Sequence, residues 1–474
     1  MLMALAMTMT ASAKQKVIFL GEHSVGNWAS NLILDKSLFS DIKAGDIISV
    51  KLSNDVDGAT AAEQTWYQVS LVITTSGDWT NLVVAKNIYY DGCCIYTVKD
   101  DAEATSIKNN GVAISGHFAN VNEVSFGDTA ATDIEYWDDS AWSTADLTVS
   151  TDKDTWKYYV LNNAQLKDCK VGDVIEVDFT PGSSSEWDAK LQIKDASGSE
   201  WTDIADYPIG GLSTAYIYVT EDNQAQLAAN DIRIGGCNYT VTDIKLLTSD
   251  IYYSLRPGDS NVSVDALPKT RTINVELNKQ FDWNATLCVP FDIADVAATF
   301  GSTVKAYTYK EKGTGNQLVF TSSENIEAGV PYYMTFGETD KDLSQITVTG
   351  VTINTTLNNK TNGGFAFKGN YTPNMDMEGK YGLTCKELPS GSGNWVWAFY
   401  KGSTGTKMNA FCAYLETTGA APSFNITLED AVTGISTVNA DTMLGGDVYN
   451  LMGIKTNNAT KGIFIKNGKK FVVK

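Results

Sequence analysis

The chain has 474 residues, of which 43% are hydrophobic and 19% are charged, and its formal net charge is −20. This length predicts about three modules, and the hydrophobic fraction supplies sizeable cores, which excludes a disordered acidic tail. The negative charge excludes nucleic acid as a partner and docking on an anionic membrane surface, because phosphates and acidic lipids would repel such a chain.

The chain begins with a short apolar run, Met1 to Thr10, followed by the small residues Ala11-Ser12-Ala13. These features are the apolar region and the cleavage site of a secretory signal peptide over residues 1–13, although the usual basic start is missing. The run is too short to span a bilayer, and no other stretch approaches the roughly 20 apolar residues that a transmembrane helix needs. The sequence therefore predicts a secreted protein, extracellular or on the outer cell surface, without a transmembrane segment.

Short alternating strand patterns separated by Gly, Asn, Asp and Ser turns follow, and they predict an all-β fold of tandem sandwiches or jelly rolls. Residues 38–53 match residues 165–180, including an Asp-x-Lys-x-Gly-Asp turn, and residues 114–126 match residues 234–246. In the same alignment Trp66 pairs with Trp187, and Trp79 pairs with Trp201. This repeat of about 120 residues defines two β-sandwich modules, module 1 at 14–127 and module 2 at 128–250.

Module 1 opens with Gly26, Trp28 and Asn31 in a Gly-x-Trp-x-x-Asn pattern, and a Lys-x-Gly-Asp turn and the sequence GVAISG follow. This order resembles the carbohydrate-binding-like β-sandwich modules that accompany polysaccharide-degrading proteins in Bacteroidetes. The resemblance implies a module that binds a glycan. Module 2 departs from the pattern at its start, where EYWDDSAW and DTWKYY stand in place of GNWASN.

The repeat is absent from residues 251–432, where only a few short segments, such as the one from Ile293, suggest helix. The sequences FDWNATLCVPFDI (281–293) and NAFCAYLE (409–416) resemble an all-β domain that is common in secreted proteins of Bacteroides and Prevotella. We expect a third β-domain here, in which Trp283 and Pro290-Phe291 are core and turn residues.

The last segment, residues 433–474, has no acidic residue after Asp447 but six lysines. Its pattern predicts three short strands broken at Met452-Gly453 and at Asn467-Gly468, of which the second suits a type I′ hairpin turn. The sequence VYNLMG…KGIFIKNGKKFVVK resembles the C-terminal sorting domain of type IX secretion substrates. The resemblance implies secretion and sorting machinery as partners, followed by anchoring at the cell surface or release. The alternative is an edge hairpin of the preceding domain.

Tryptophan is the informative residue type, because eight of the 11 tryptophans precede residue 202. An indole plane packs against the C–H face of a pyranose ring, while neighbouring polar groups bind the ring hydroxyls. Trp79 and Trp201 each follow a Ser-Gly turn among polar residues, which favours a partly exposed ring at a loop edge. The alternative is a core residue shared by both copies. The candidate ligand-binding residues are Trp28, Trp66, Asp78, Trp79, Asn81, Trp187, Glu200, Trp201 and Asp203.

Catalytic and metal signals are weak. Neither His23 nor His117 lies in a nucleophile–base pattern, and no HExxH, GxSxG or phosphate-binding glycine loop occurs. Carboxylates are so numerous that counting alone does not exclude a glycosidase pair. The acidic stretch 53–60 fails the EF-hand pattern, so we predict no cofactor and keep a structural Ca²⁺ as an alternative. The seven cysteines lack a zinc or disulfide spacing and are expected to be mostly core residues.

Together these features predict a non-catalytic protein that binds polysaccharide or oligosaccharide at the bacterial surface or outside the cell. Neutral glycans are favoured, because no basic patch in the sequence offers a clamp for carboxylates. The alternative is a structural or adhesive surface protein whose sandwiches are spacers, and a glycoside hydrolase is a less favoured third reading.

Overall fold

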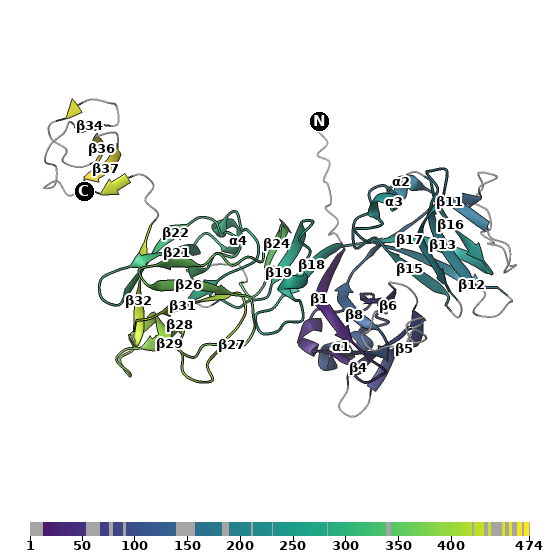
Figure 1. The fold of residues 1–474 in the computed structure, drawn as a ribbon, viewed down its shortest axis with the longest axis horizontal. Coiled ribbons are helices and arrows are strands. Elements are labelled where there is room, and N and C mark those ends of the chain that lie inside the picture. Colours follow the sequence, from purple (N-terminus) through teal and green to yellow (C-terminus); the bar gives the residue numbers. More distant parts are fainter. Residues whose placement is uncertain are drawn as a thin grey trace, which may run out of the picture. The chain divides into compact units, whose positions relative to one another are not determined.

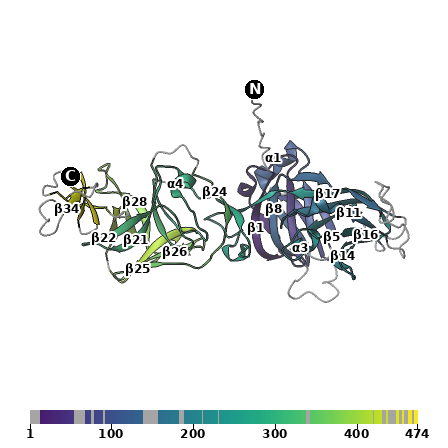
Figure 2. The same cartoon turned by 90° about the horizontal axis from the view of Figure 1, so that it is seen from above.

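The computed structural model consists of two compact units, shown in Figures 1 and 2. Unit 1 comprises Met1–Lys279 and Gln345–Ile353, and unit 2 comprises Gln280–Ser344 and Asn354–Lys474. Each unit is described by itself below. The structure describes residues 13–53, 67–74, 79–88, 92–138, 157–182, 189–209, 212–229, 231–281, 283–337, 343–419, 421–430, 435–437, 448–450, 455–456, 462–466 and 469–473.

The predicted all-β class is confirmed, since strands make up most of the described residues and the helices are short. The predicted helix from Ile293 appears as α4 (Val296–Phe300), and Asp295 caps it by accepting a hydrogen bond from the N–H of Ala298 at 2.8 Å. The ten-residue helix α1 (Asp101–Asn110) was not predicted. The remaining described helices are α2 (Asn163–Leu166), α3 (Gln224–Leu227), η1 (Lys36–Phe39) and η3 (Val264–Ala266).

Module 1 is a sandwich of two sheets, and the chain alternates between them as in a jelly roll, except that the successive strands at 67–74 and 79–88 are neighbours in one sheet. Its first sheet has the order β1 (Lys14–Ser24), β8 (Asn120–Gly127), β3 (Ile47–Ser53), β6 (Cys93–Thr97). Its second sheet has the order β2 (Leu32–Leu34), β7 (Val112–His117), β4 (Tyr67–Thr74), β5 (Trp79–Ile88). Ile48 and Leu71 are among the fully buried residues of the core between these sheets.

Module 2 repeats this arrangement with one additional strand, β10 (Tyr136–Asp138), at the edge of its second sheet, which confirms the tandem sandwich fold. Its first sheet has the order β15 (Thr214–Tyr218), β12 (Val174–Pro181), β17 (Tyr239–Thr248), β9 (Ala130–Asp133). Its second sheet has the order β10 (Tyr136–Asp138), β11 (Lys157–Leu161), β16 (Ile232–Cys237), β13 (Lys190–Asp195), β14 (Thr202–Pro208). A separate apolar core that includes Leu191 and Ile234 fills the space between them.

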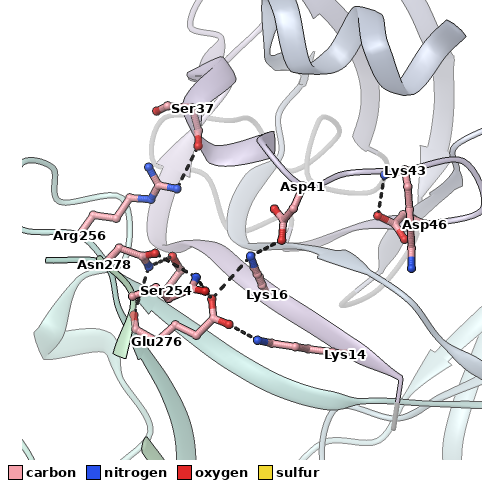
Figure 3. Close-up of polar contacts among 11 residues, drawn as sticks. Lys14, Lys16, Ser37, Asp41, Lys43, Asp46, Ser254, Arg256, Glu276 and Asn278 are labelled. Carbon is pink, nitrogen blue, oxygen red and sulfur yellow. Dashed lines mark hydrogen bonds and ion pairs between the residues drawn. The ribbon is translucent and has the colours of Figure 1, made fainter. Parts of the chain in front are cut away.

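The Asp-x-Lys-x-Gly-Asp turn has the same geometry in both modules. In module 1 the Asp46 carboxylate accepts a hydrogen bond from the N–H of Lys43 at 2.9 Å (Figure 3), and in module 2 Asp173 accepts one from Lys170 at 2.8 Å. Both aspartates are buried, with 2% and 4% of their surface exposed. The shared sequence motif therefore marks a shared buried turn.

The first sheet of module 1 continues beyond residue 250. Strand β18 (Asp250–Leu255) lies parallel to β1, and β19 (Ile273–Leu277) and β24 (Ile346–Val351) extend the sheet to seven strands. The boundary between residues 250 and 251 stays a prediction drawn from the repeat. The backbone pairing nevertheless joins this part of the chain to module 1.

A buried carboxylate joins the added strands to β1 (Figure 3). Glu276 is fully buried and binds the ammonium group of Lys14, while the Lys16 nitrogen lies 3.7 Å from its second oxygen. Gln345 donates a hydrogen bond to the same carboxylate at 3.0 Å, and Lys16 also pairs with Asp41. Two cations and an amide thus offset the cost of burying this charge.

The first sheets of the two modules contact each other through a small apolar cluster. Ile47 and Ile95 of module 1 and Val174 and Leu247 of module 2 are its buried members. Cys93, Tyr216 and Tyr218 pack around them, and the Lys51 ammonium lies 4.7 Å from the centroid of the Tyr218 ring. We call this set the inter-module cluster.

Unit 2 is built on a ten-stranded sheet that surrounds an aromatic core, whose buried members include Phe320, Phe367 and Phe399. The sheet order is β20 (Asn284–Leu287), β23 (Tyr332–Thr335), β21 (Lys305–Lys312), β22 (Gln317–Ser323), β32 (Ser423–Glu429), β29 (Trp395–Lys401), β28 (Tyr381–Glu387), β31 (Cys412–Thr417), β26 (Phe365–Asn370), β25 (Lys360–Asn362). A small ladder pairs β27 (Met375–Asp376) with β30 (Lys407–Met408).

Phe291 is buried in unit 2, whereas Trp283 is 65% exposed, so the expected core position of Trp283 is wrong. Trp283 precedes β20, and its carbonyl oxygen accepts a hydrogen bond from the N–H of Phe336 at 2.9 Å. The backbone of Trp283 is therefore bound to unit 2 while its side chain is exposed. The seven cysteines, all within the described ranges, form no disulfide. Four of them are buried, in agreement with the prediction for most: Cys94, Cys169, Cys237 and Cys288.

The C-terminal segment forms its own five-stranded sheet. Its order is β33 (Ile435–Thr437), β37 (Lys469–Val473), β36 (Gly462–Lys466), β34 (Val448–Asn450), β35 (Lys455–Thr456). The pairing of Lys466 with Lys469 closes a hairpin over the predicted Asn467-Gly468 turn, whose two residues lie outside the described ranges.

Candidate functional site

The outer face of the second sheet of module 2 is polar and aromatic. On β11, β13 and β16 every second residue points into the core, as the burial of Tyr159, Leu191 and Ile234 shows. The intervening residues of these strands therefore point outward. Asp203 and Asp206 of β14 pair with two of them, Lys194 and Gln192, and Trp201 contacts two others, Tyr158 and Arg233. We call this set the module 2 face: Tyr158, Gln192, Lys194, Trp201, Asp203, Asp206 and Arg233.

A row of side chains crosses this face from one strand to the next. Tyr158 and Gln192 both lie opposite Gly235, which has no side chain, and Gln192 lies opposite Asp206. The Tyr158 hydroxyl donates a hydrogen bond to the Gln192 side-chain oxygen across the glycine, and the Gln192 amide donates to Asp206 at 2.7 Å. Burial raises the pKa of Tyr158 to about 12, and the carboxylates of Asp203 and Asp206 add to the rise. The hydroxyl therefore stays a donor at neutral pH.

Trp201 lies at the end of this row and is held from two sides. The Tyr158 ring meets it edge-on, with ring centroids 5.1 Å apart at an angle of 90°. The Arg233 guanidinium lies 5.6 Å from the indole centroid, within the range of a cation–π contact. Trp201 is nevertheless 41% exposed, so part of the oriented indole remains open to solvent.

The two cations of the module 2 face are each paired with a carboxylate. Lys194 lies 2.6 Å from Asp203, its partner across the strand pair, and Arg233 lies 2.8 Å from Asp231. The sequence analysis found no basic patch, and the structure brings two basic residues together on this face. Their charge is balanced locally, so the face offers hydrogen-bonding groups without an excess of positive charge.

The strand ladders place Trp79 and Trp201 at equivalent positions. In module 1 Ile73 pairs with Thr80, and in module 2 Asp195 pairs with Thr202, so each tryptophan immediately precedes the corresponding threonine. The backbone of Trp79 opens β5, and its side chain lies outside what the structure describes.

The same ladders correct the alignment of Trp66 with Trp187. Gln68 lies opposite His117, and Lys190 lies opposite Cys237, the residue that aligns with His117. Gln68 is therefore equivalent to Lys190, one position later than the sequence alignment places it. The stretch from Trp187 to Trp201 is one residue longer than the stretch from Trp66 to Trp79. The extra residue of module 2 therefore lies before β13 and not in the hairpin between β13 and β14. Trp66, Trp187 and Asp78 themselves lie outside the described residues.

Module 1 lacks the charged groups of the module 2 face. Val72 and Ala113 occupy the positions of Lys194 and Arg233, and they are 4% and 0% exposed. Asn81 is exposed at the position of Asp203. The equivalent surface of module 1 is thus less polar, and the two copies are chemically different.

Trp28 lies apart from these positions. It is 43% exposed in the loop between β1 and β2, with a positive φ of 58°, and its N–H donates to Gly116 at 2.8 Å. Trp79 pairs with Thr74, whose N–H donates to Gly111, so the two tryptophans lie at opposite ends of β7. Five residues of strand separate these ends, a distance of about 16 Å. The backbones of Trp28 and Trp79 therefore lie at separate ends of the sheet.

Sequence reasoning found Trp201, Asp203 and the exposed Glu200, and it missed the rest of the module 2 face. The strand sequence KLQIKD (190–195) already alternates Gln192 and Lys194 with core residues, a pattern that marks them as outward-facing. Arg233 stands in the same phase within IRIGGC. Tyr158 carried no such signal, because it is one of two adjacent tyrosines.

Within the described ranges no group of three or more His, Cys, Asp or Glu side chains could hold a metal ion. Most of the acidic stretch 53–60 lies outside those ranges. His117 is buried and packs edge-on against Phe118, with ring centroids 4.5 Å apart, while the His23 Nε2 atom lies 3.3 Å from the Ser30 carbonyl oxygen. No helix of the described residues is long and apolar enough to cross a membrane.

No protein-family model and no curated protein matches the chain. Among solved structures, the mixed-linkage glucan utilization locus protein SGBP-B of Bacteroides ovatus, in complex with a mixed-linkage heptasaccharide, is 18% identical over 24% of this chain and 29% of its own, with a TM-score of 0.20. BuGH86 in complex with neoagarooctaose is 9% identical over 43% of this chain and 30% of its own, with a TM-score of 0.18.

The tandem CBM22-1–CBM22-2 domain of Paenibacillus barcinonensis Xyn10C is 8% identical over 48% of this chain and 84% of its own, with a TM-score of 0.16. This chain spans less than a third of the length of the first two structures, at 29% and 30%. All three TM-scores are low, so the function is inferred below from this chain's own residues.

Proposed function

We propose that the chain is a non-catalytic polysaccharide-binding protein and that the module 2 face carries its binding site. The observation that supports this most is the half-exposed indole of Trp201, which Tyr158 and Arg233 hold in one orientation. A pre-oriented aromatic plane binds a pyranose ring with little loss of side-chain freedom. The hydrogen-bonded row from Tyr158 to Asp206 supplies donors and acceptors beside that plane.

The ligand in this proposal is a neutral glycan. Lys194 and Arg233 are each paired with a carboxylate, so neither is left to neutralise a uronic acid. A negatively charged sugar would also be repelled by the net charge of −20 of the whole chain. Secretion to the cell surface or beyond, through the machinery that the C-terminal resemblance implies, belongs to the same proposal.

The test is affinity electrophoresis of the full chain in gels that contain hydroxyethylcellulose, mixed-linkage β-glucan, galactomannan or polygalacturonate. Trp201→Ala should weaken retardation by a neutral polymer about tenfold or more, which corresponds to about 1.4 kcal/mol. Trp28→Ala is the matched comparison, because its exposed fraction of 43% is close to the 41% of Trp201. Loss of retardation in Trp28→Ala alone would move the site to module 1. Release of reducing sugar from any polymer would contradict the non-catalytic assignment.

The second candidate function is a rigid spacer in a structural or adhesive surface protein. The inter-module cluster and the continuous seven-stranded sheet favour it, because both stiffen unit 1. Wild-type migration unchanged by every polymer in the panel would favour the spacer over glycan binding.

A further inference from the structure

Strands β28 and β29 of unit 2 form a hairpin (Figure 1). Aromatic residues along β29 range from fully buried to exposed. Phe399 is fully buried, Trp397 is half-buried, and Trp395 is 66% exposed. These three residues are spaced by two along β29 and therefore share one face, with about 6.6 Å between neighbouring positions. Phe399 therefore lies at the buried end of this run, and Trp395 lies at its exposed end.

An ordered carboxylate lies directly beside the exposed indole. Glu387 pairs with Trp395 across the two strands, and cross-strand partners lie on the same face. Its two oxygens accept hydrogen bonds from the N–H groups of Gly391 at 2.8 Å and Gly393 at 2.5 Å. These backbone bonds hold the pKa of the Glu387 carboxyl below its usual value, so the group is ionised at neutral pH. Each oxygen keeps a second lone pair that a further donor can use.

The loop that joins the two strands is closed by its own hydrogen bonds. The N–H of Leu388 donates to the Asn394 carbonyl at 2.8 Å, and the Asn394 side chain donates back to the Leu388 carbonyl at 3.0 Å. The N–H of Ser392 donates to the Pro389 carbonyl at 3.1 Å. The neighbouring cation, Lys386, lies on the other face of the hairpin, 4.1 Å from the Tyr400 ring. The loop backbone and the Glu387 carboxylate are therefore held by hydrogen bonds, and Lys386 lies on the opposite face from them.

We propose that Trp395 and Glu387 form a second glycan-binding site, separate from the module 2 face, for a neutral polysaccharide. The C–H face of a pyranose ring stacks on the Trp395 indole, and ring hydroxyls donate hydrogen bonds to the free lone pairs of Glu387. An apolar protein partner fits less well, because it would cover the Glu387 carboxylate without offering a hydrogen-bond donor. Uronic acids and sulfated glycans fit less well, because they carry the same charge as Glu387. Trp397 extends the platform toward the core.

The experiment uses the full chain with Trp201→Ala already in place, so that only the second site contributes. In the same neutral-polymer gels, Trp201→Ala/Trp395→Ala should lose the remaining retardation, a decrease of about tenfold or more. Trp283→Ala in the same background is the matched control, because Trp283 is 65% exposed and belongs to the same unit. Glu387→Gln should weaken retardation less than Trp395→Ala and should reduce the discrimination against polygalacturonate.

The results distinguish failure of the hairpin site from failure of the module 2 site. Equal retardation of the Trp395→Ala and Trp283→Ala double variants overturns the hairpin site and leaves the module 2 face untouched. An unchanged Trp201→Ala single variant together with loss in Trp395→Ala overturns the module 2 site and supports the hairpin. A wild type that no neutral polymer retards overturns both. Sedimentation velocity completes the test, because a dimer that dissociates on Trp395→Ala would make the hairpin a contact between copies and overturn the glycan site.

Discussion

The buried turn aspartate of module 1 gives a quantitative prediction about pH. Burial raises the pKa of Asp46 from 3.8 to about 6, the neighbouring Asp128 carboxylate adds to the rise, and the hydrogen bond from the Lys43 N–H opposes it. A carboxyl whose pKa is raised by folding favours the folded state below the unfolded pKa. That contribution is lost as the pH rises through the folded pKa, here between about pH 4 and pH 6.

The magnitude follows from the two pKa values. A difference of roughly two units corresponds to about 3 kcal/mol, of which roughly 2.5 kcal/mol falls between pH 4 and pH 8. Asp46→Asn removes the titration, while the oxygen of the introduced amide can still accept the Lys43 N–H. Relative to wild type, the variant should therefore gain up to roughly 2.5 kcal/mol in the free energy of unfolding between pH 4 and pH 8.

The assay is urea-induced unfolding of the full chain at a series of pH values, with the wild type and Asp46→Asn compared at each pH. Asp173→Asn should shift in the same direction, because burial also raises the pKa of Asp173. Asp168→Asn, at an exposed position of the same motif, is the control. Parallel pH profiles for the wild type and Asp46→Asn would refute the reasoning, because the buried carboxyl would then contribute no proton linkage.

Three further predictions concern stability and binding. Gly236→Ala should destabilise unit 1 by at least about 2 kcal/mol in urea unfolding, while Gly198→Ala should not, because a Cβ at Gly236 would lie 1.8 Å from the Lys190 carbonyl oxygen. Glu276→Gln should cost about 2 kcal/mol, since Lys14 and Lys16 lose their buried partner, and an unchanged urea midpoint would contradict that role. Tyr158→Phe should leave the fold intact and weaken glycan binding by about 1 kcal/mol in calorimetry, and an affinity equal to wild type would exclude the Tyr158 hydroxyl from the site.

Much of the fold of unit 1 could be predicted from the sequence, because the patterns that specify its strands and turns lie within short stretches of the chain. Alternation along a strand fixes which residues enter the core, and the repeated Asp-x-Lys-x-Gly-Asp turn fixes where β3 and β12 begin. Helix α1 could have been predicted from its ends, since Asp100 caps the N–H of Glu103 at 2.9 Å and Gly111 follows the last turn with a φ of 81°.

The extension of the module 1 sheet could not be predicted in this way. Lys14 pairs with Asp250, so the contact joins residues far apart in the chain, and the parallel pairing of β1 with β18 leaves no turn signal between them. Pairing between residues this far apart leaves no pattern in any short window of sequence.

Only those residues of the candidate site that carry a local sequence pattern could be predicted. A Ser-Gly turn before Trp201 indicates a loop edge, and the exposed indole agrees with that prediction. Tyr158 and Arg233 come from strands that are distant in sequence from Trp201, so only the sheet order brings them to it. For Trp79 the sequence prediction stands untested, since its side chain lies outside the described residues.

The inter-module cluster has a consequence for how the protein can be divided. Ile47, Ile95, Val174 and Leu247 are each less than a tenth exposed because the two modules cover one another. A fragment that ends at residue 127 would present half of this cluster to water and would also lose β18, one of the two strands that pair with β1. The stretch of chain that was duplicated is therefore shorter than the compact unit to which it belongs. A fragment for expression should retain both modules together with β18, β19 and β24.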